Sequence, residues 1–231
     1  MPSAITPDSC LGELALEVPA AAGTFEKLGM DFCCGGRRTL AAACASKSLD
    51  VNEVIAALQP AAGAAPAPDA HWRTAPLPEV IEHIVDRHHG YVRTETPRLQ
   101  TWLDKVVAAH GARHAELARL RAVFTRMSGE LAQHMAKEEM ILFPAMRHLE
   151  AGADAGLAHP VRRMMTEHED AGRDLAEMRE LSGGYQPPAS ACTTWRVLYQ
   201  GLEAFEADLH RHVHLENNVL FPRALETEAN V

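Results

Sequence analysis

The sequence has no long run of apolar residues, and its first residues do not resemble a secretion signal. Crossing a bilayer takes roughly 18 to 20 consecutive apolar residues, and no stretch approaches that length. Met1–Thr6 contains neither the charged segment nor the apolar segment that marks a signal peptide. We therefore expect a cytoplasmic protein with no membrane association.

Basic residues are also scarce. The chain has 22 Lys and Arg against 31 Asp and Glu, which gives a formal net charge of −9. Proteins that bind nucleic acids track the phosphates with a basic surface, so no nucleic-acid partner is expected. The 231 residues, of which 47% are hydrophobic, are enough for one or two domains with a buried core.

Cysteine is rare, with five residues in the whole chain. An odd number without a secretion signal argues against a disulfide framework. Any cysteine of importance is then expected to act through its reactivity or by binding a metal. Cys10, Cys44 and Cys192 are isolated in the sequence and are interpreted as structural.

The adjacent Cys33 and Cys34 are followed by two glycines, which permit positive φ and a close backbone approach. A helix predicted to start at Arg37–Thr39 would lower the thiol pKa values, together with its arginines, and favour thiolates. Adjacent cysteines form a disulfide only under strain, so free thiols, metal ligands or nitrosylation sites are expected. The plainer alternative is a pair of small buried side chains at a turn.

A stretch rich in alanine and proline, 61–68, divides the chain. We predict a small helical domain over 1–60, a linker over 61–76 and a larger domain over 77–231. The small domain has four short helical patterns, over 11–16, 19–28, 38–45 and 51–58.

The larger domain has four long helical patterns, over roughly 78–108, 113–148, 157–181 and 191–225. No segment shows the period-two alternation of a strand. The expected fold is all-α: an up-down-up-down four-helix bundle preceded by the small helical domain. All 13 histidines lie at or after His71, so an imidazole site would belong to the second part of the chain.

An internal repeat in the bundle contains polar as well as apolar residues. Residues 134–144 read HMAKEEMILFP, and residues 212–222 read HVHLENNVLFP. Each copy has an upstream histidine at nearly the same spacing, His89 for the first and His168 for the second. The bundle is therefore interpreted as two similar helical hairpins around a pseudo-twofold axis.

The repeated polar residues fall on apolar faces of their helices. His134 and Glu138 lie one turn apart on such a face, and His212 and Glu216 repeat the pair. Burying several imidazoles and carboxylates without partners would cost many kcal/mol, and a bound metal pair removes that cost. Imidazole with carboxylate suits iron, zinc or manganese, and carboxylates can bridge two cations.

A plainer interpretation exists for either copy alone. A core histidine is often held by a hydrogen bond, and a His/Glu pair one turn apart can be a surface pair. Two copies, each with an upstream histidine, favour the metal site. A structural zinc site remains an alternative to iron.

The ligand on the first helix is open between two neighbours. The apolar residues of that helix are closer in phase to His88, whereas the spacing of the repeat favours His89. We choose His89 and keep His88 as the alternative.

Other polar residues near the proposed ligands are predicted to have different roles. His83, His210 and His214 lie off the apolar faces of their helices and are expected in solvent. Glu139 is a less suitable ligand than Glu138. Glu130 and Glu167 are either outer partners of the ligands or surface charges.

These residues resemble the hemerythrin-like di-iron family. The resemblance implies two iron ions bridged by carboxylates and by an oxo or hydroxo group, with room for O₂ or NO. It also favours His89, because an aromatic residue usually precedes that ligand. The implied ligands are His89, His134, Glu138, His168, His212 and Glu216, with the two glutamates as bridges.

The stretch MDFCCGG ahead of such a bundle resembles one family more specifically, the iron–sulfur cluster repair proteins, also called repair of iron centres. The stretches LGELAL at 11–16 and LENNVLFP at 215–222 extend the resemblance over almost the whole chain. It implies a cytoplasmic di-iron protein that restores clusters damaged by oxidative or nitrosative stress. Its partners would be the damaged iron–sulfur proteins.

Several functions are compatible with this resemblance. In the leading hypothesis the di-iron centre donates iron, and Cys33 and Cys34 assist as a thiol or iron-transfer pair. Alternatives are a nitric oxide sink, an O₂ or NO sensor, and an enzyme that reduces nitric oxide. Whether the protein is an enzyme and whether it forms a homodimer stay open.

Overall fold

The computed structural model describes residues 5–62, 69–149 and 156–230. Within these ranges the regular elements are helical, and the only β pairing is an isolated bridge between Cys10 and Thr39. The chain divides into two compact units. One comprises Met1–Val80 with His210–Glu226, and the other comprises Ile81–Leu209 with Thr227–Val231.

The first unit contains the small helical domain. The predicted short helices are confirmed, and they pack around a core that includes Leu11, Phe25 and Phe32, each at most 1% exposed. Fully burying such a side chain contributes about 1.5–3 kcal/mol. The helices are α1 (Leu11–Glu17), α2 (Ala21–Lys27), α3 (Leu40–Ser46) and α4 (Val51–Ala62).

Helix α3 begins later than the sequence predicts. Thr39 is its N-cap, and the Thr39 side chain accepts a hydrogen bond from the Ala42 N–H. The helix terminus is therefore separated from the cysteine pair by several residues.

Helix α4 continues into the predicted linker, and Ala70–Arg73 (η1) forms a short 3₁₀ turn. The middle of that linker, 63–68, lies outside the described residues.

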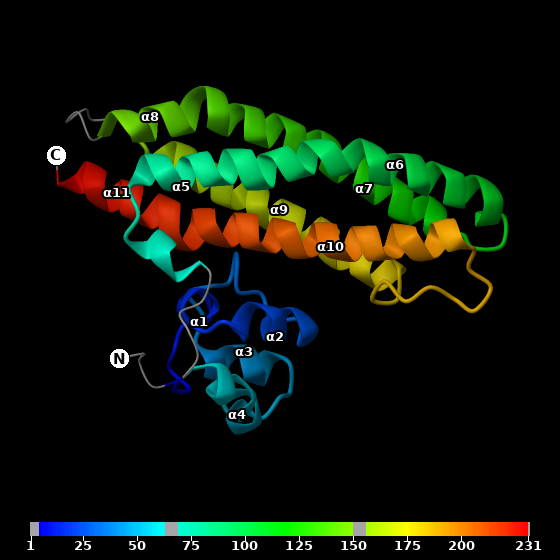
Figure 1. The fold of residues 1–231 in the computed structure, drawn as a ribbon, viewed down its shortest axis with the longest axis horizontal. Helices are drawn as coiled ribbons and strands as arrows, with labels where there is room; N and C mark the ends of the chain where they lie inside the picture. The colour runs from blue at the N-terminus through cyan, green and yellow to red at the C-terminus, as the bar shows by residue number, and fades with distance from the viewer. Residues whose placement is uncertain (1–4, 63–68, 150–155, 231) are drawn as a thin grey trace. The chain divides into compact units, whose positions relative to one another are not determined.

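The second unit is a bundle of long helices. Figure 1 shows α6, α7, α9 and the part of α10 up to Leu209 as long rods whose directions alternate along the chain. The predicted all-α bundle is confirmed. The helices from Leu77 onward are α5 (Leu77–His83), α6 (Gly90–His110), α7 (Glu116–Lys137), α8 (Phe143–His148), α9 (Ala158–Leu181), α10 (Thr193–Leu215) and α11 (Phe221–Ala229). By the division above, Leu77–Val80 of α5, the last turns of α10 and α11 up to Glu226 belong to the first unit.

Apolar side chains fill the interior of the bundle. Phe124 and Phe205 meet edge to face with ring centroids 5.7 Å apart, and both are fully buried. Gly201 allows α10 to approach α6 closely, because a Cβ there would lie 2.7 Å from Leu99 Cδ2. The bundle thus provides a tightly packed frame for any polar site inside it.

Three π-helical segments interrupt the long helices. They are η2 (Ile84–His89), η3 (Glu138–Leu142) and η5 (Glu216–Leu220). A π turn contains one residue more than an α turn, so it shifts the phase of everything that follows. The step from Ile84 to His89 is five residues, which explains why an α-helical count brought His88 closer to the apolar face.

No helix among the described residues combines the length and the apolar character needed to cross a membrane.

Candidate metal centre

Glu138 lies between two histidines in the bundle interior. Its Oε1 is 3.2 Å from His134 Nε2, and its Oε2 is 3.5 Å from His89 Nε2. The Glu138 and His89 side chains are fully buried, and His134 is 3% exposed. One carboxylate therefore presents a separate oxygen to each of two imidazoles, which is the arrangement of a bridging ligand.

His168 on α9 extends this group. Its Nε2 lies 2.9 Å from His134 Nε2, and its side chain is 2% exposed. Two ring nitrogens this close together could both donate a lone pair to one cation.

The outer nitrogens of two of these histidines face carboxylates. His89 Nδ1 lies 2.6 Å from Glu139 Oε1, and His134 Nδ1 lies 2.9 Å from Glu167 Oε2. A carboxylate accepts a hydrogen bond, so each Nδ1 carries the proton and each Nε2 keeps its lone pair toward Glu138. Metal-binding histidines are oriented in this way.

Cations hold these outer carboxylates in their ionised form. Lys137 Nζ and Arg163 Nε donate to Glu167 at 2.5 and 2.8 Å. Burial alone would raise the pKa of Glu167, but hydrogen bonds from Lys137, from His134 and from the arginine lower it to about 2. For Glu139, burial also opposes ionisation, and hydrogen bonds from His89 and from an arginine leave its pKa below the ordinary value.

The equivalent pair of the second repeat is equally buried. His212 Nε2 lies 3.0 Å from Glu216 Oε1, and the two side chains are 1% and 0% exposed. Glu216 is the first residue of the π segment η5, as Glu138 is of η3. Both repeats thus place a carboxylate at the start of a wide helical turn.

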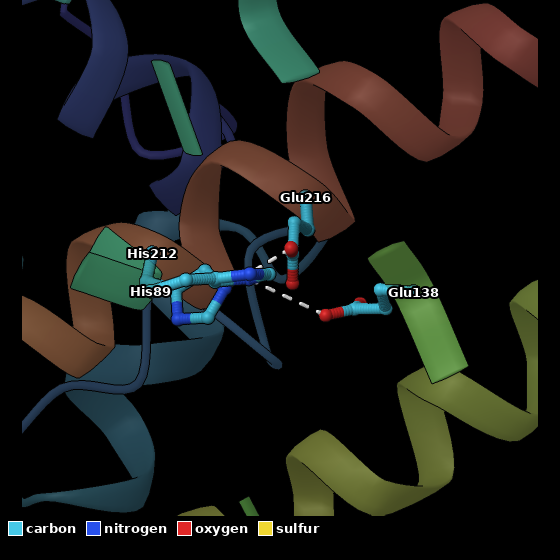
Figure 2. Close-up of side chains that lie close together, drawn as sticks. All are labelled: His89, Glu138, His212 and Glu216. Carbon is cyan, nitrogen blue, oxygen red and sulfur yellow. Dashed lines mark hydrogen bonds and ion pairs between the residues drawn. The ribbon is translucent and has the colours of Figure 1, made fainter. Parts of the chain in front are cut away.

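The predicted ligands come together in two groups. One ligand atom from each of four residues lies within 4.8 Å of the others in both groups, and the two glutamates belong to both. Figure 2 shows the side chains of the first group pointing toward one another. The first group is His89, Glu138, His212 and Glu216, and the second is His134, Glu138, His168 and Glu216.

The donor set fits a pair of metal ions. Each group combines two imidazoles with carboxylates, which is the set expected for iron and also acceptable to zinc or manganese. Carboxylates that belong to both groups are what a bridged metal pair requires.

His88 has a different environment from His89. It is buried, but its Nδ1 lies 3.1 Å from Asp208 Oδ2. Of the two candidates on the first helix, the structure therefore places His89 beside Glu138.

His83, His210 and His214 were predicted to lie in solvent. The prediction is wrong for His214, which is buried, whereas His83 and His210 are only partly exposed. His214 is 4% exposed and meets the Phe32 ring at 5.5 Å between centroids. Burial lowers its pKa to about 4. The apolar face counted on an α-helix missed His214, because it packs against Phe32 of the small domain.

Glu130 and Glu167, predicted to be either outer partners of the ligands or surface charges, differ in their environments. Glu130 is an exposed residue, whereas Glu167 contacts His134 as described. The contact between Glu139 and His89 was not predicted from the sequence. The signal was its position directly after Glu138, which directs its side chain away from the ligand group and toward the outer nitrogen of a histidine.

Asp31 organises the cysteine pair. Its Oδ1 accepts hydrogen bonds from the N–H groups of Cys33 and Cys34, at 3.1 and 2.9 Å, and from Cys33 Sγ at 3.3 Å. Cys33 is buried and Cys34 is half-buried, and both are free thiols.

The expected activation of the Cys33 thiol is wrong. A hydrogen bond with Cys34, burial, and the charges of Cys34 and Asp31 all raise the pKa of Cys33 well above its ordinary value. Helix α3 starts only at Leu40, so its N-terminus does not stabilise a thiolate there.

The cysteine loop is anchored by the π segment η5. Asn218 Nδ2 donates to the Cys33 carbonyl at 2.9 Å, and Asn217 Nδ2 donates to the same oxygen at 3.4 Å. A Cβ on Gly36 would lie 2.2 Å from Asn218 Oδ1, so only glycine fits there. The turn that starts at Glu216 therefore also positions Cys33.

Asn217 and Asn218 lie in the stretch LENNVLFP, but no role for either side chain follows from the sequence. The feature of the sequence that could have indicated a role is that the two asparagines have no counterpart in the first copy of the repeat. The position of Asn218 corresponds in the first copy to Met140, which is 77% exposed.

The sequence matches two known families. Residues 80–224 match the Hemerythrin HHE cation binding domain, and residues 7–62 match a Domain of Unknown function (DUF542). Similar proteins include the iron-sulfur cluster repair protein YtfE of Pectobacterium carotovorum subsp. carotovorum (strain PC1), 44% identical over 221 residues. The protein of the same name from Musicola paradisiaca (strain Ech703) is 42% identical over 222 residues. Each comparison covers 96% of this chain and 98% of the relative.

Proposed function

The chain belongs to the family of iron–sulfur cluster repair proteins with a Hemerythrin HHE cation binding domain, and from this premise we propose that it donates iron to damaged iron–sulfur clusters. The observation that carries the proposal is the position of Glu138, whose two oxygens face His134 and His89 separately. A carboxylate whose two oxygens face different histidines is suited to bridging two ions, whereas a single ion would need only one of these oxygen–histidine pairs.

The proposed centre holds two iron ions. The first group of ligands would bind one ion and the second group the other, with Glu138 and Glu216 shared between them. When bound, the irons supply Lewis acidity and redox capacity. Glu139 and Glu167 keep the inner ring nitrogens of their histidines deprotonated and directed inward.

Iron donation requires a site that can release its ion. Neutral imidazoles and carboxylates hold iron without thiolates, and protonation of either ligand type weakens binding. Cys33 and Cys34 are proposed to assist the transfer, because the π turn that begins at Glu216 also binds the Cys33 carbonyl through Asn218. Damaged iron–sulfur proteins would be the recipients.

The proposal is tested by reactivation of a nitrosylated iron–sulfur enzyme with the iron-loaded protein under anaerobic conditions. We expect His134→Leu to abolish reactivation, because it removes a ligand, and Cys33→Ser/Cys34→Ser to slow it. His88→Gln is the matched control, since His88 is buried beside Asp208 and outside the ligand groups. Equal reactivation by wild type and His134→Leu would contradict the proposal.

A second candidate function is the binding of nitric oxide or O₂. A cavity of about 180 Å³ lies beside His134 and His168 and is also lined by Lys137, Arg163 and Glu167. This volume is large for a diatomic molecule but below the roughly 300–1,000 Å³ of common organic ligand sites. Stoichiometric formation of an iron–nitrosyl band without reactivation of the cluster enzyme would favour binding. Catalytic release of nitrous oxide would instead favour an enzyme.

A further inference from the structure

The cysteine loop brings three metal-binding side chains together outside the bundle centre. One ligand atom from each of Asp31, Cys33 and Cys34 lies within 4.8 Å of the other two. The Asp31 carboxylate and the Cys33 thiol are in direct contact, at 3.3 Å between Oδ1 and Sγ. Two sulfurs and a carboxylate are a suitable set for a thiophilic divalent cation.

The backbone of the loop holds these groups in place. The N–H groups of Cys33 and Cys34 both donate to Asp31 Oδ1, so the carboxylate is fixed on the side of the thiols. Gly35 lets the chain wrap around it, because a Cβ there would lie 2.8 Å from the Asp31 carbonyl and 3.1 Å from Oδ2. On the other side, Asn218 binds the Cys33 carbonyl. The cluster is therefore preorganised and does not need the chain to refold around an ion.

The same loop is accessible from one side. Cys33 is 6% exposed, whereas Cys34 is half-buried and Asp31 is exposed. Three protein ligands leave at least one position of a four-coordinate ion for an outside ligand, in contrast to closed structural sites with four protein ligands.

We propose that Asp31, Cys33 and Cys34 form a second metal site, open to solvent, for a thiophilic divalent cation such as Fe²⁺ or Zn²⁺. Binding replaces the proton of each thiol with a metal–sulfur bond, and both protons pass to solvent. No electron is transferred. The site itself follows from the loop geometry, and its use as a relay for iron on the way to a client rests on the proposed function.

The test uses Co²⁺ as a spectroscopic probe and the full-length, iron-loaded protein under anaerobic conditions. We expect cobalt to produce a sulfur-to-metal charge-transfer band with proton release, at one cobalt per chain. Cys33→Ser/Cys34→Ser should lose the band. Asp31→Asn keeps an oxygen that accepts the two N–H bonds but removes the charge. Since loss of even an outer partner of a ligand costs about 10–100-fold in affinity, Asp31→Asn should weaken cobalt binding at least about tenfold.

Two matched controls lie in the same small domain. Asp50 is an exposed aspartate whose Oδ1 also accepts a backbone N–H bond, from Asn52, so Asp50→Asn tests the loss of a charge alone. Cys10→Ser tests the loss of a half-buried thiol elsewhere in the domain. Both should bind cobalt as the wild type does, and circular dichroism checks that every variant is folded.

The inference is overturned if the wild type shows no charge-transfer band, or if folded Asp31→Asn binds cobalt with unchanged affinity. The proposed function fails separately. If the wild-type protein binds cobalt at this loop but does not reactivate a damaged cluster, the proposed second metal site stands and the proposed repair function is refuted.

Discussion

At the scale of single residues, the orientation of each imidazole determines whether the bundle can bind metal. His89 and His134 turn their Nε2 atoms toward Glu138 because Glu139 and Glu167 accept the Nδ1 protons. The opposite tautomer would place an N–H against the carboxylate and leave no lone pair for a cation. The outer carboxylates are therefore part of the proposed centre.

Glu167→Ala should lower iron affinity by about 10–100-fold, because His134 loses the acceptor that orients its ring. Competition with an iron chelator measures the effect. Glu130→Ala is the control, since Glu130 is an exposed glutamate of α7. Equal affinity of the two variants would show that Glu167 does not orient the ligand.

The thiols should differ in reactivity with pH. Alkylation requires the thiolate, and the raised pKa of Cys33 keeps its thiolate scarce at a pH where an unperturbed cysteine, with pKa about 8.5, is half ionised. We expect iodoacetamide to label Cys34 and the exposed Cys192 first, and the Cys33 rate to keep increasing above that pH. Peptide mass spectrometry follows each site. Labelling of Cys33 as fast as Cys192 at neutral pH would contradict the raised pKa.

At the scale of elements, the α-helical period predicted the long helices but not their π turns. Apolar faces and the repeat identified Glu138 and Glu216, because buried side chains impose a visible period. A π turn leaves no comparable mark in the sequence, since the extra residue changes the phase only once. For this reason the count on the first helix left His88 and His89 open.

The π turn η5 should stabilise the cysteine loop through Asn218. Asn218→Asp keeps the size of the side chain but replaces the donor that faces the Cys33 carbonyl with an oxygen. The Cys33 carbonyl then keeps only the longer bond from Asn217, and loss of the shorter hydrogen bond costs about 0.5–1.5 kcal/mol, which urea unfolding would detect. Alkylation of Cys33 should also become faster.

Met140 offers a matched control for this prediction, because it occupies the equivalent position of the first repeat and is 77% exposed. Met140→Ala should change the free energy of unfolding by no more than about 0.5 kcal/mol. If Asn218→Asp were as stable as Met140→Ala, with unchanged Cys33 labelling, the anchoring role would be refuted.

At the scale of the whole molecule, the two repeats carry equivalent ligands but different neighbours. The repeat was sufficient to predict the six bundle residues that the structure brings together, because polar residues on apolar faces are rare and recurred in register. Contacts that join distant parts of the sequence were not predictable in this way. Asn218 meets Cys33 across 185 positions, and nothing in either local pattern indicates the other.

The small domain shows the same limit. Its helices follow from local patterns, whereas the raised pKa of Cys33 depends on Asp31 and Cys34 folding toward one another. Charge and helix position in the sequence indicated the opposite direction for that pKa. Three-dimensional proximity, which the sequence does not show directly, determines the chemistry of this loop.

The most direct test of the central claim is metal analysis combined with Mössbauer spectroscopy on anaerobically prepared, full-length protein. The bundle site predicts two irons per chain in a coupled non-haem pair, and loss of the pair in His134→Leu with retention in His88→Gln. One zinc and no iron, or a single isolated iron unaffected by His134→Leu, would contradict the claim.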